Sequence, residues 1–254
     1  MTHSILLAHD LGTTGNKATL FDAEEGVALA STFEPYPTAY PQPGWAEQDP
    51  ADWQRAIWQG TRRLLSQTGA DPGAIAAVSF SGHTQGALVV DRQGSPLGNA
   101  IIWADQRATA QTELIRSVCD AQTLYHLTGH RLSPTYTAPK VLWIKEHFPE
   151  VYERAYKVLQ AKDYAAFLLT GVFATDHSDA SSTLLFDLVG RHWAAELIAA
   201  LGLDAGLFPV AYPSTTVIGH VTPGAAAASG LLAGTPVVIG GGDGACATVG
   251  AGAV

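Results

Sequence analysis

Short apolar runs alternate along this chain with longer stretches in which apolar residues recur every three or four positions. The short runs are typical of buried strands, and the periodic stretches are typical of helices that pack one face against a core. Because strands and helices alternate, the order of elements predicts an α/β fold. We predict strands over residues 5–9, 17–21, 27–33, 75–80, 87–90, 100–103 and 235–239.

The clearest helix signal follows a proline-rich segment. Asp49 is of the residue type that caps a helix N-terminus, and Pro50 suits the first helical position. Trp53, Ile57 and Leu64 then follow at helical spacing. This pattern predicts an amphipathic helix that begins at residue 50.

The rest of the chain carries mixed signals. Residues 105–170 are mostly helical in pattern, with breaks at 129–134 and near 149. Residues 171–192 mix short strand and turn signals, whereas 193–202 and the small residues from 245 onward predict helices. No linker or repeat divides the chain, so we expect residues 1–254 to form one domain with a helical insertion near 105–170.

Charge excludes some partners. The chain has 14 Lys and Arg against 23 Asp and Glu, a formal net charge of −9. Nucleic acids and anionic membrane surfaces select clustered basic residues, so neither is expected as a partner. A few backbone N–H groups and one lysine still suffice to hold a phosphate.

Compartment signals favour the cytoplasm. No basic residue precedes the first apolar run, so no secretory signal is predicted. Two cysteines are too few for a disulfide framework or a zinc site. The charge-free run 205–242 is long enough to span a bilayer, but four prolines interrupt it. We interpret this run as loop, small-residue helix and buried strand.

A first candidate site follows the first predicted strand. Asp10 ends that strand, and Gly12, Thr13, Thr14 and Lys17 follow within seven residues. Glycine allows close backbone approach to an anion, hydroxyls donate hydrogen bonds, and a carboxylate can hold Mg²⁺ directly or through water. The same residues also suit an ordinary hairpin turn, and the segment alone does not decide between the two.

A second candidate lies after the last predicted strand. Asp243 stands in a glycine-rich turn that opens a small-residue helix. The glycines leave room for a ligand, and the carboxylate can accept a proton from a hydroxyl nucleophile. The alternative is that Asp243 only caps the helix.

A third candidate combines two segments that each follow a predicted strand. His83, Thr84 and Gln85 form one segment, and Trp103 and Asp105 belong to the other. Amide, hydroxyl, carboxylate and indole groups together suit a sugar, because they bind its hydroxyls and its apolar ring or chain carbons. Alternatively, Asp105 caps the next helix and pairs with the arginine two residues later.

Taken together, these motifs resemble the FGGY family of carbohydrate kinases, and its xylulokinase branch in particular. The matching stretches occur in the family's order and cover nearly the whole chain. They read AHDLGTTGNKATLFD, GWAEQDPADW, NAIIWADQRA, TAPKVLWIKEHFPE, AKDYAAFLLTG, DHSDASSTLLFD and GGGDGACATVGAG.

The resemblance implies an actin-like, ribonuclease-H-like domain with a mixed sheet flanked by helices. It implies ATP-dependent phosphorylation of a sugar hydroxyl with Mg²⁺, with a ketopentose such as D-xylulose as the first-choice substrate. Family members are about twice as long, so residues 1–254 match their N-terminal, sugar-binding domain. The C-terminal nucleotide domain, with the adenine site, is absent from this chain, and the isolated domain is expected to be inactive. The expected partners are the sugar, ATP and that second domain, and a homodimer is left open.

The resemblance also assigns roles to residues. Asp243 matches the family's catalytic base, and Asp10 matches the acidic residue near Mg²⁺ and the phosphates. The family's substrate contacts fall on Thr84 and Gln85, and Gly244 stands at a position that lines the family's sugar pocket. From the second and third candidate segments we also expect Asp243, His83, Trp103 and Asp105 to contact the substrate. The phosphate loop corresponds to Gly12, Thr13, Thr14 and Lys17.

Two departures concern the sugar. Gln85 stands where xylulokinases commonly have His, and Gly244 stands where they commonly have Asn. Gluconate, or another open-chain sugar or polyol, is therefore an alternative substrate. Outside the kinase class, we retain a non-catalytic sugar-binding or regulatory module and an actin-like structural ATPase as alternatives.

Overall fold

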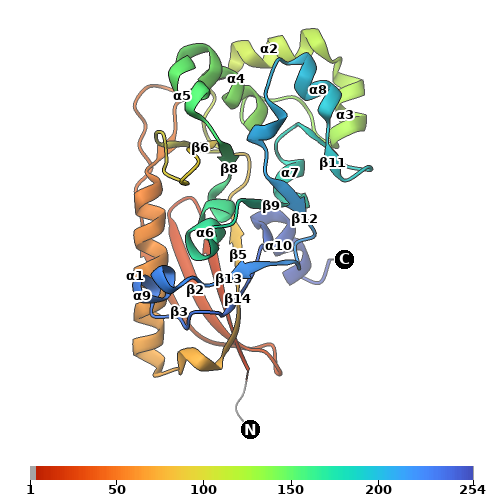
Figure 1. Ribbon diagram of the computed structural model, residues 1–254. Coiled ribbons are helices and arrows are strands. Elements are labelled where there is room, and N and C mark those ends of the chain that lie inside the picture. Colours follow the sequence, from red (N-terminus) through yellow and green to blue (C-terminus); the bar gives the residue numbers. More distant parts are fainter. Residues whose placement is uncertain (1–3, 254) are drawn as a thin grey trace.

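A mixed β-sheet forms the base of the structure, a computed structural model that describes residues 4–253 (Figure 1). Its strands are β1 (Ile5–Leu11), β2 (Gly15–Asp22), β3 (Ala28–Pro35), β5 (Ile75–Gly82), β13 (Val217–His220), β14 (Pro236–Val238) and β15 (Gly241–Gly242). The order is β13-β14-β5-β1-β2-β3, with β15 also paired to β5. β1, β2 and β3 run antiparallel, whereas β5 is parallel to β1, β14 and β15. The predicted α/β class is confirmed.

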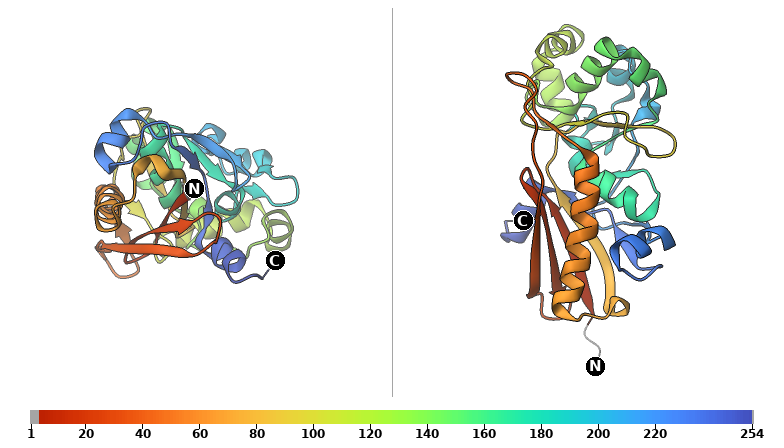
Figure 2. Two further views of the ribbon diagram at one scale, coloured as in Figure 1. Left: turned by 90° about the horizontal axis from the view of Figure 1, so that it is seen from below. Right: turned by 90° about the vertical axis from the view of Figure 1, so that its left-hand side faces the viewer.

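The long helix α1 (Pro50–Thr68) packs against β2 and β3 and lies along the sheet in Figure 2. It begins where the sequence predicts, because the Asp49 carboxylate accepts a hydrogen bond from the backbone N–H of Ala51. Trp53, Ile57 and Leu64 are each at most 1% exposed. They form the face of the helix that packs on the core.

The remaining helices and strands gather mainly at the other end of the molecule. Helices α2, α3, α4, α5 and α8 lie together there (Figure 1), and α6 packs on β5. The helices are α2 (Thr109–Val118), α3 (Ala121–Thr128), α4 (Thr137–His147), α5 (Pro149–Arg154), α6 (Ala161–Thr170), α7 (His177–Ser181), α8 (Ala195–Ala200), α9 (Pro223–Ser229) and α10 (Asp243–Gly250). Two-stranded pairs are formed by β4 (Glu47–Gln48) with β7 (Ala100–Ile101), β6 (Leu88–Val90) with β8 (Lys157–Leu159), β9 (Ala174–Asp176) with β12 (Val210–Tyr212), and β10 (Phe186–Asp187) with β11 (His192–Trp193). Short 3₁₀ turns occupy Pro72–Ala74 and Ala205–Leu207.

Three local predictions need correction. The predicted helical stretch 105–170 contains the strand β8, because its short apolar run pairs with the distant β6. The segment 171–192 contains the helix α7, which Asp176 caps by accepting hydrogen bonds from two backbone N–H groups. β7 ends at Ile101, so Trp103 lies beyond the strand and is 43% exposed.

Buried apolar side chains form two clusters. One joins the sheet to α1, α6 and α9, and the other lies among the helices at the opposite end. The turn between β1 and β2 lies at the end of the sheet that faces the second cluster (Figure 2). The division of the chain into one domain with an insertion stays a prediction.

Candidate functional site

The turn between β1 and β2 is held rigid by its surroundings. The Gly12 N–H donates to the Gly15 carbonyl at 3.0 Å. A side chain at Gly15 would come within 2.7 Å of a carbonyl oxygen of β3, so the close packing of the turn requires glycine there. The Tyr36 hydroxyl donates to the Gly12 carbonyl, and the Gln48 amide donates to the Thr13 carbonyl, each at 2.7 Å. The turn is therefore an ordered hairpin in which Gly12 and Thr13 are half-buried and Thr14 is exposed.

Strand register places the two candidate carboxylates at one edge of the sheet. Asp10 pairs with Ser81 of β5 on one side and with Lys17 of β2 on the other. Gly241 of β15 also pairs with Ser81. Asp10 and Gly241 are therefore level across the sheet, two strand spacings or about 10 Å apart. Asp10 and Lys17 are both exposed, and the Asp10 carboxylate makes no hydrogen bond or ion pair with any residue of 4–253.

The glycine loop before α10 is packed too tightly for side chains. Gly240 has φ +73°, and a side chain there would meet the Phe80 carbonyl oxygen at 1.8 Å. A side chain at Gly242 would come within 2.4 Å of the Thr84 methyl group. Asp243 follows at the start of α10, exposed, with its carboxylate accepting from the next backbone N–H at 2.7 Å.

A pocket of about 290 Å³ unites residues from all three candidate segments. Trp103 and Thr13 are linked directly, since the indole Nε1–H donates to the Thr13 hydroxyl at 3.0 Å. A proton acceptor, hydrogen-bonding groups and an aromatic ring therefore share one cavity. The lining residues are Thr13, His83, Thr84, Gln85, Trp103 and Asp243.

His83 is held as a neutral ring in a defined tautomer. Gln48 donates through its Nε2 to the Thr13 carbonyl, and its Oε1 accepts from Trp53 Nε1 at 2.9 Å. Because Oε1 can only accept, the 3.2 Å contact from His83 Nε2 to it requires a proton on that nitrogen. Burial, and then the charge of Lys140, lowers the pKa of His83 to about 4. His83 Nδ1 therefore carries a lone pair at neutral pH, and it has no hydrogen-bond partner among residues 4–253.

Lys140 supports two walls of the pocket, a role that sequence reasoning missed. Its buried Nζ donates to the carbonyls of Gln85 at 2.7 Å, Ile102 at 2.8 Å and Thr135. Gln85 has a left-handed φ of +66°, and Ile102 immediately precedes Trp103. Burial lowers the pKa of Lys140 to about 7. In the sequence, Lys140 stands between apolar residues in one of the stretches that match the family, but its three carbonyl partners come from separate loops and could not be read from that pattern.

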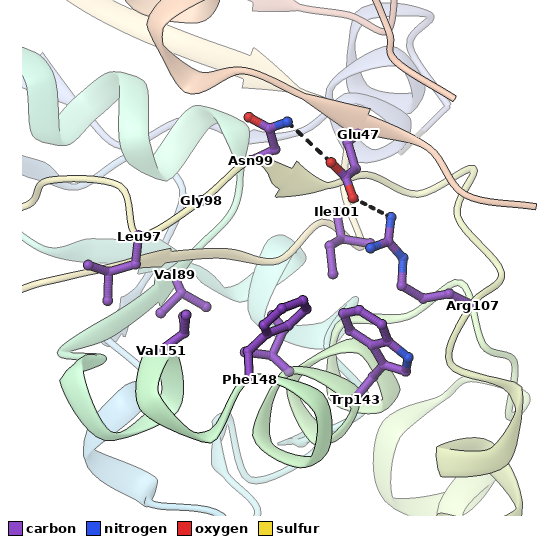
Figure 3. A pocket seen from close by; sticks show the side chains of 11 residues that line it. Glu47, Val89, Leu97, Gly98, Asn99, Ile101, Arg107, Trp143, Phe148 and Val151 are labelled. Atoms are coloured by element: carbon purple, nitrogen blue, oxygen red, sulfur yellow. Dashed lines mark hydrogen bonds and ion pairs between the residues drawn. The ribbon is translucent and has the colours of Figure 1, made fainter. Parts of the chain in front are cut away.

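The structure does not bring Asp105 into this pocket. Its carboxylate is fully buried and accepts from the Ala46 backbone N–H at 2.6 Å and from Arg107 at 2.7 Å. Arg107 in turn reaches Glu47 at 2.7 Å and lines a different pocket of about 260 Å³, between Glu47 and the ring of Trp143 (Figure 3). Asp105 thus pairs with the arginine, as the alternative interpretation predicted. It does not cap the next helix, because the N-cap residue of α2 is Ala108.

The other predicted residues lie around the pocket without lining it. Gly12 and Thr14 belong to the hairpin turn, and Thr14 is exposed. Gly244 is exposed on the first turn of α10. Within residues 4–253, no group of three or more His, Cys, Asp or Glu side chains is placed to hold a metal ion. A lone exposed carboxylate such as Asp10 fits Mg²⁺ that arrives with phosphate ligands and keeps several waters.

The mixed sheet, with a hairpin turn and a glycine-rich carboxylate loop at one edge, has the fold of a sugar-kinase domain. Residues 5–250 match the FGGY family of carbohydrate kinases, N-terminal domain, and the chain belongs to this family. It is 35% identical over 243 residues to the xylulose kinase of Bacillus subtilis (strain 168), covering 96% of this chain and 48% of that protein. It is 36% identical over 247 residues to the xylulose kinase of Escherichia coli (strain K12), covering 96% and 49%.

A solved structure shows the same fold. The gluconate kinase from Lactobacillus acidophilus superposes with a TM-score of 0.92 at 29% identity, over 99% of this chain and 50% of that one. The chain spans about half the length of the curated relatives it matches. Among the described residues, no helix is both long enough and apolar enough to span a bilayer.

Proposed function

We propose that this chain is the sugar-binding domain of an ATP-dependent carbohydrate kinase, with Asp243 as the general base and D-xylulose as the preferred acceptor. One observation carries the proposal. The exposed carboxylate of Asp243 shares a pocket with Thr13 of the hairpin turn and with Trp103. A proton acceptor for a sugar hydroxyl therefore lies beside groups that suit a phosphate.

The proposed chemistry divides between the walls of the pocket. Asp243 takes the proton of the attacking hydroxyl, which makes the oxygen a better nucleophile. Trp103 offers an apolar face to the carbon chain of the sugar, and His83, Thr84 and Gln85 offer hydrogen-bonding groups to its hydroxyls. Because each of these groups is held on ordered backbone, the sugar is fixed in one orientation before transfer.

The hairpin turn is the proposed phosphate site. Gly12 and the hydroxyls of Thr13 and Thr14 would contact the transferring phosphoryl group, and Lys17 adds a positive charge. Asp10 would hold Mg²⁺ through its free carboxylate. Magnesium bound with ATP neutralises charge on the phosphates during transfer.

We propose that nucleotide binding requires residues outside this chain. The relatives are about twice as long, so we propose that the adenine site lies on a second, C-terminal domain that closes over the pocket. Closure of that kind excludes water from the reacting phosphate. A homodimer and a cytoplasmic location remain predictions.

Gluconate or a polyol is the second candidate substrate. The likeness to a gluconate kinase structure favours it, as do Gln85 and Gly244, which depart from the xylulokinase pattern. Gln85 lines the pocket directly.

A direct test measures ADP formation by the protein at its full natural length with D-xylulose, gluconate, glycerol or no sugar. Strong stimulation by one compound supports the kinase and identifies its acceptor. Sugar binding without ADP formation under any condition would replace the proposal with a non-catalytic binding module. The Asp243→Asn variant serves as the matched control, because it keeps the size and hydrogen-bonding capacity of the side chain without its basicity.

A further inference from the structure

The glycine loop that carries Asp243 is attached to a separate helix. The Gly242 N–H donates to the Ser178 hydroxyl oxygen of α7 at 2.8 Å, across 64 residues of sequence. Gly242 immediately precedes Asp243 and is the N-cap residue of α10, yet no side chain of its own can cap the helix. The position of the proposed base therefore depends on a contact from α7.

The Ser178 hydroxyl is fixed as an acceptor by its other bond. A hydroxyl has a single proton, and that of Ser178 is donated to Asp176 Oδ2 at 2.7 Å. The lone pairs that remain face the Gly242 N–H. The Ser178 backbone N–H also donates to Asp176 Oδ2, at 2.9 Å, which fixes the position of the serine itself.

Asp176 belongs to a buried ionic cluster. Lys162 is fully buried and contacts three carboxylates, Asp163 at 2.8 Å, Asp176 at 2.9 Å and Asp179 at 3.1 Å. Burial raises the pKa of Asp163 and of Asp179. Burial also acts on Asp176, but Lys162 and the hydroxyls of Ser214 and Ser178 outweigh it and lower its pKa. Of the three carboxylates, Asp176, which orients Ser178, is therefore the one whose surroundings favour the charged form.

Close packing leaves the loop little freedom around this contact. A side chain at Gly241 would lie 3.3 Å from the Ser178 hydroxyl, and one at Gly242 would meet Thr84 at 2.4 Å. The loop thus lies between α7 and a wall of the pocket. A shift of the Gly242 N–H would move the next residue, Asp243, relative to a bound sugar.

We propose that Ser178 is a positioning residue, which sets the place of Asp243 through the Gly242 backbone and is itself oriented by Asp176 and Lys162. This inference rests on the proposed function of Asp243 as the base. It predicts that the Ser178 hydroxyl acts on the rate of phosphoryl transfer rather than on sugar affinity. A misplacement of about 1 Å in such a group can lower a rate by about 100-fold.

Two serines provide a matched test. Ser178 and Ser214 both donate to Asp176 Oδ2, at 2.7 and 2.6 Å, but only Ser178 also accepts from Gly242. Ser214 meets the loop through its backbone carbonyl, which Ser214→Ala leaves in place. Hydrogen exchange of peptides spanning residues 239–244, sugar KM and kcat are measured for Ser178→Ala and Ser214→Ala in the protein at its full natural length.

We expect Ser178→Ala to speed exchange of the Gly242 amide about tenfold or more and to lower kcat at least tenfold, with the sugar KM within about twofold. Ser214→Ala should stay within about twofold of the parent protein in all three measurements. Unchanged Gly242 exchange in Ser178→Ala, or equal effects of the two variants, would overturn the positioning role. If the parent protein phosphorylates no sugar, the proposed function fails, while the exchange measurement still decides whether Ser178 holds the loop.

Discussion

The buried His9 of β1 is expected to lower the free energy of unfolding as the pH falls. His9 is 1% exposed and stacks on Phe80, with ring centroids 5.6 Å apart. The Thr61 hydroxyl donates to the Ile57 carbonyl at 2.8 Å, so its oxygen accepts from His9 Nε2 at 3.3 Å. His9 Nδ1 lies 3.1 Å from the Asn16 amide nitrogen. Burial lowers the pKa of His9 from 6.5 to about 4, so the ring is neutral in the folded state.

The sign of the effect follows from the proton balance. Between pH 6.5 and pH 4 the unfolded chain binds a proton at His9 that the folded chain does not, so unfolding is favoured as the pH falls through this window. At pH 5 the free energy of unfolding drops by about 2 kcal/mol from His9 alone. His83 has the same lowered pKa of about 4, and together the two histidines remove about 4 kcal/mol.

Urea unfolding of the chain at pH 7 and pH 5, followed by tryptophan fluorescence, measures this loss. His9→Gln should lose about 2 kcal/mol less than the parent chain between the two pH values. Thr61→Val is the control, because it removes the hydroxyl beside the ring but keeps the titrating group, and so should retain the full pH response. An equal pH response of His9→Gln and the parent chain would refute the assignment of the acid sensitivity to this buried ring.

Three further predictions concern the pocket. Asp243→Asn should lower kcat, measured by ADP formation, by a factor of about 10² to 10⁴. Its sugar affinity, measured by calorimetry, should stay within about threefold of the parent protein. Normal turnover would contradict the role of Asp243 as the base. Trp103→Phe keeps an aromatic face but removes the hydrogen bond from the indole to the Thr13 hydroxyl. Sugar affinity should therefore fall about three- to tenfold in the same titrations. An unchanged affinity would show that this bond does not support the pocket. Lys140→Met leaves the carbonyls of Gln85 and Ile102 without their donor. Urea unfolding at pH 7 should therefore show a free energy of unfolding lower by about 3 kcal/mol, together with weaker sugar binding. A variant as stable as the parent chain would count against the support role of Lys140.

The local elements could be predicted because their signals lie within a few residues of one another. Asp49 caps α1 through the backbone two residues later, and the apolar face of α1 repeats every turn. The short strand β8 and the helix α7 were missed for the opposite reason. β8 is a strand because of its partner β6, and α7 depends on the cap that Asp176 forms in the folded chain.

The candidate site, too, could be predicted from the sequence only in part. The sequence by itself determined which residue types could bind a phosphate or accept a proton, because glycine, hydroxyl and carboxylate groups carry that chemistry wherever they stand. Only the tertiary structure decided which of them meet. Strand register places Asp10 and Gly241 opposite the same residue, Ser81, whereas the Asp105 carboxylate is buried against the Ala46 backbone N–H, 59 residues away in sequence. Contacts of this kind join residues far apart in the chain, and their geometry depends on packing that no short stretch of sequence encodes.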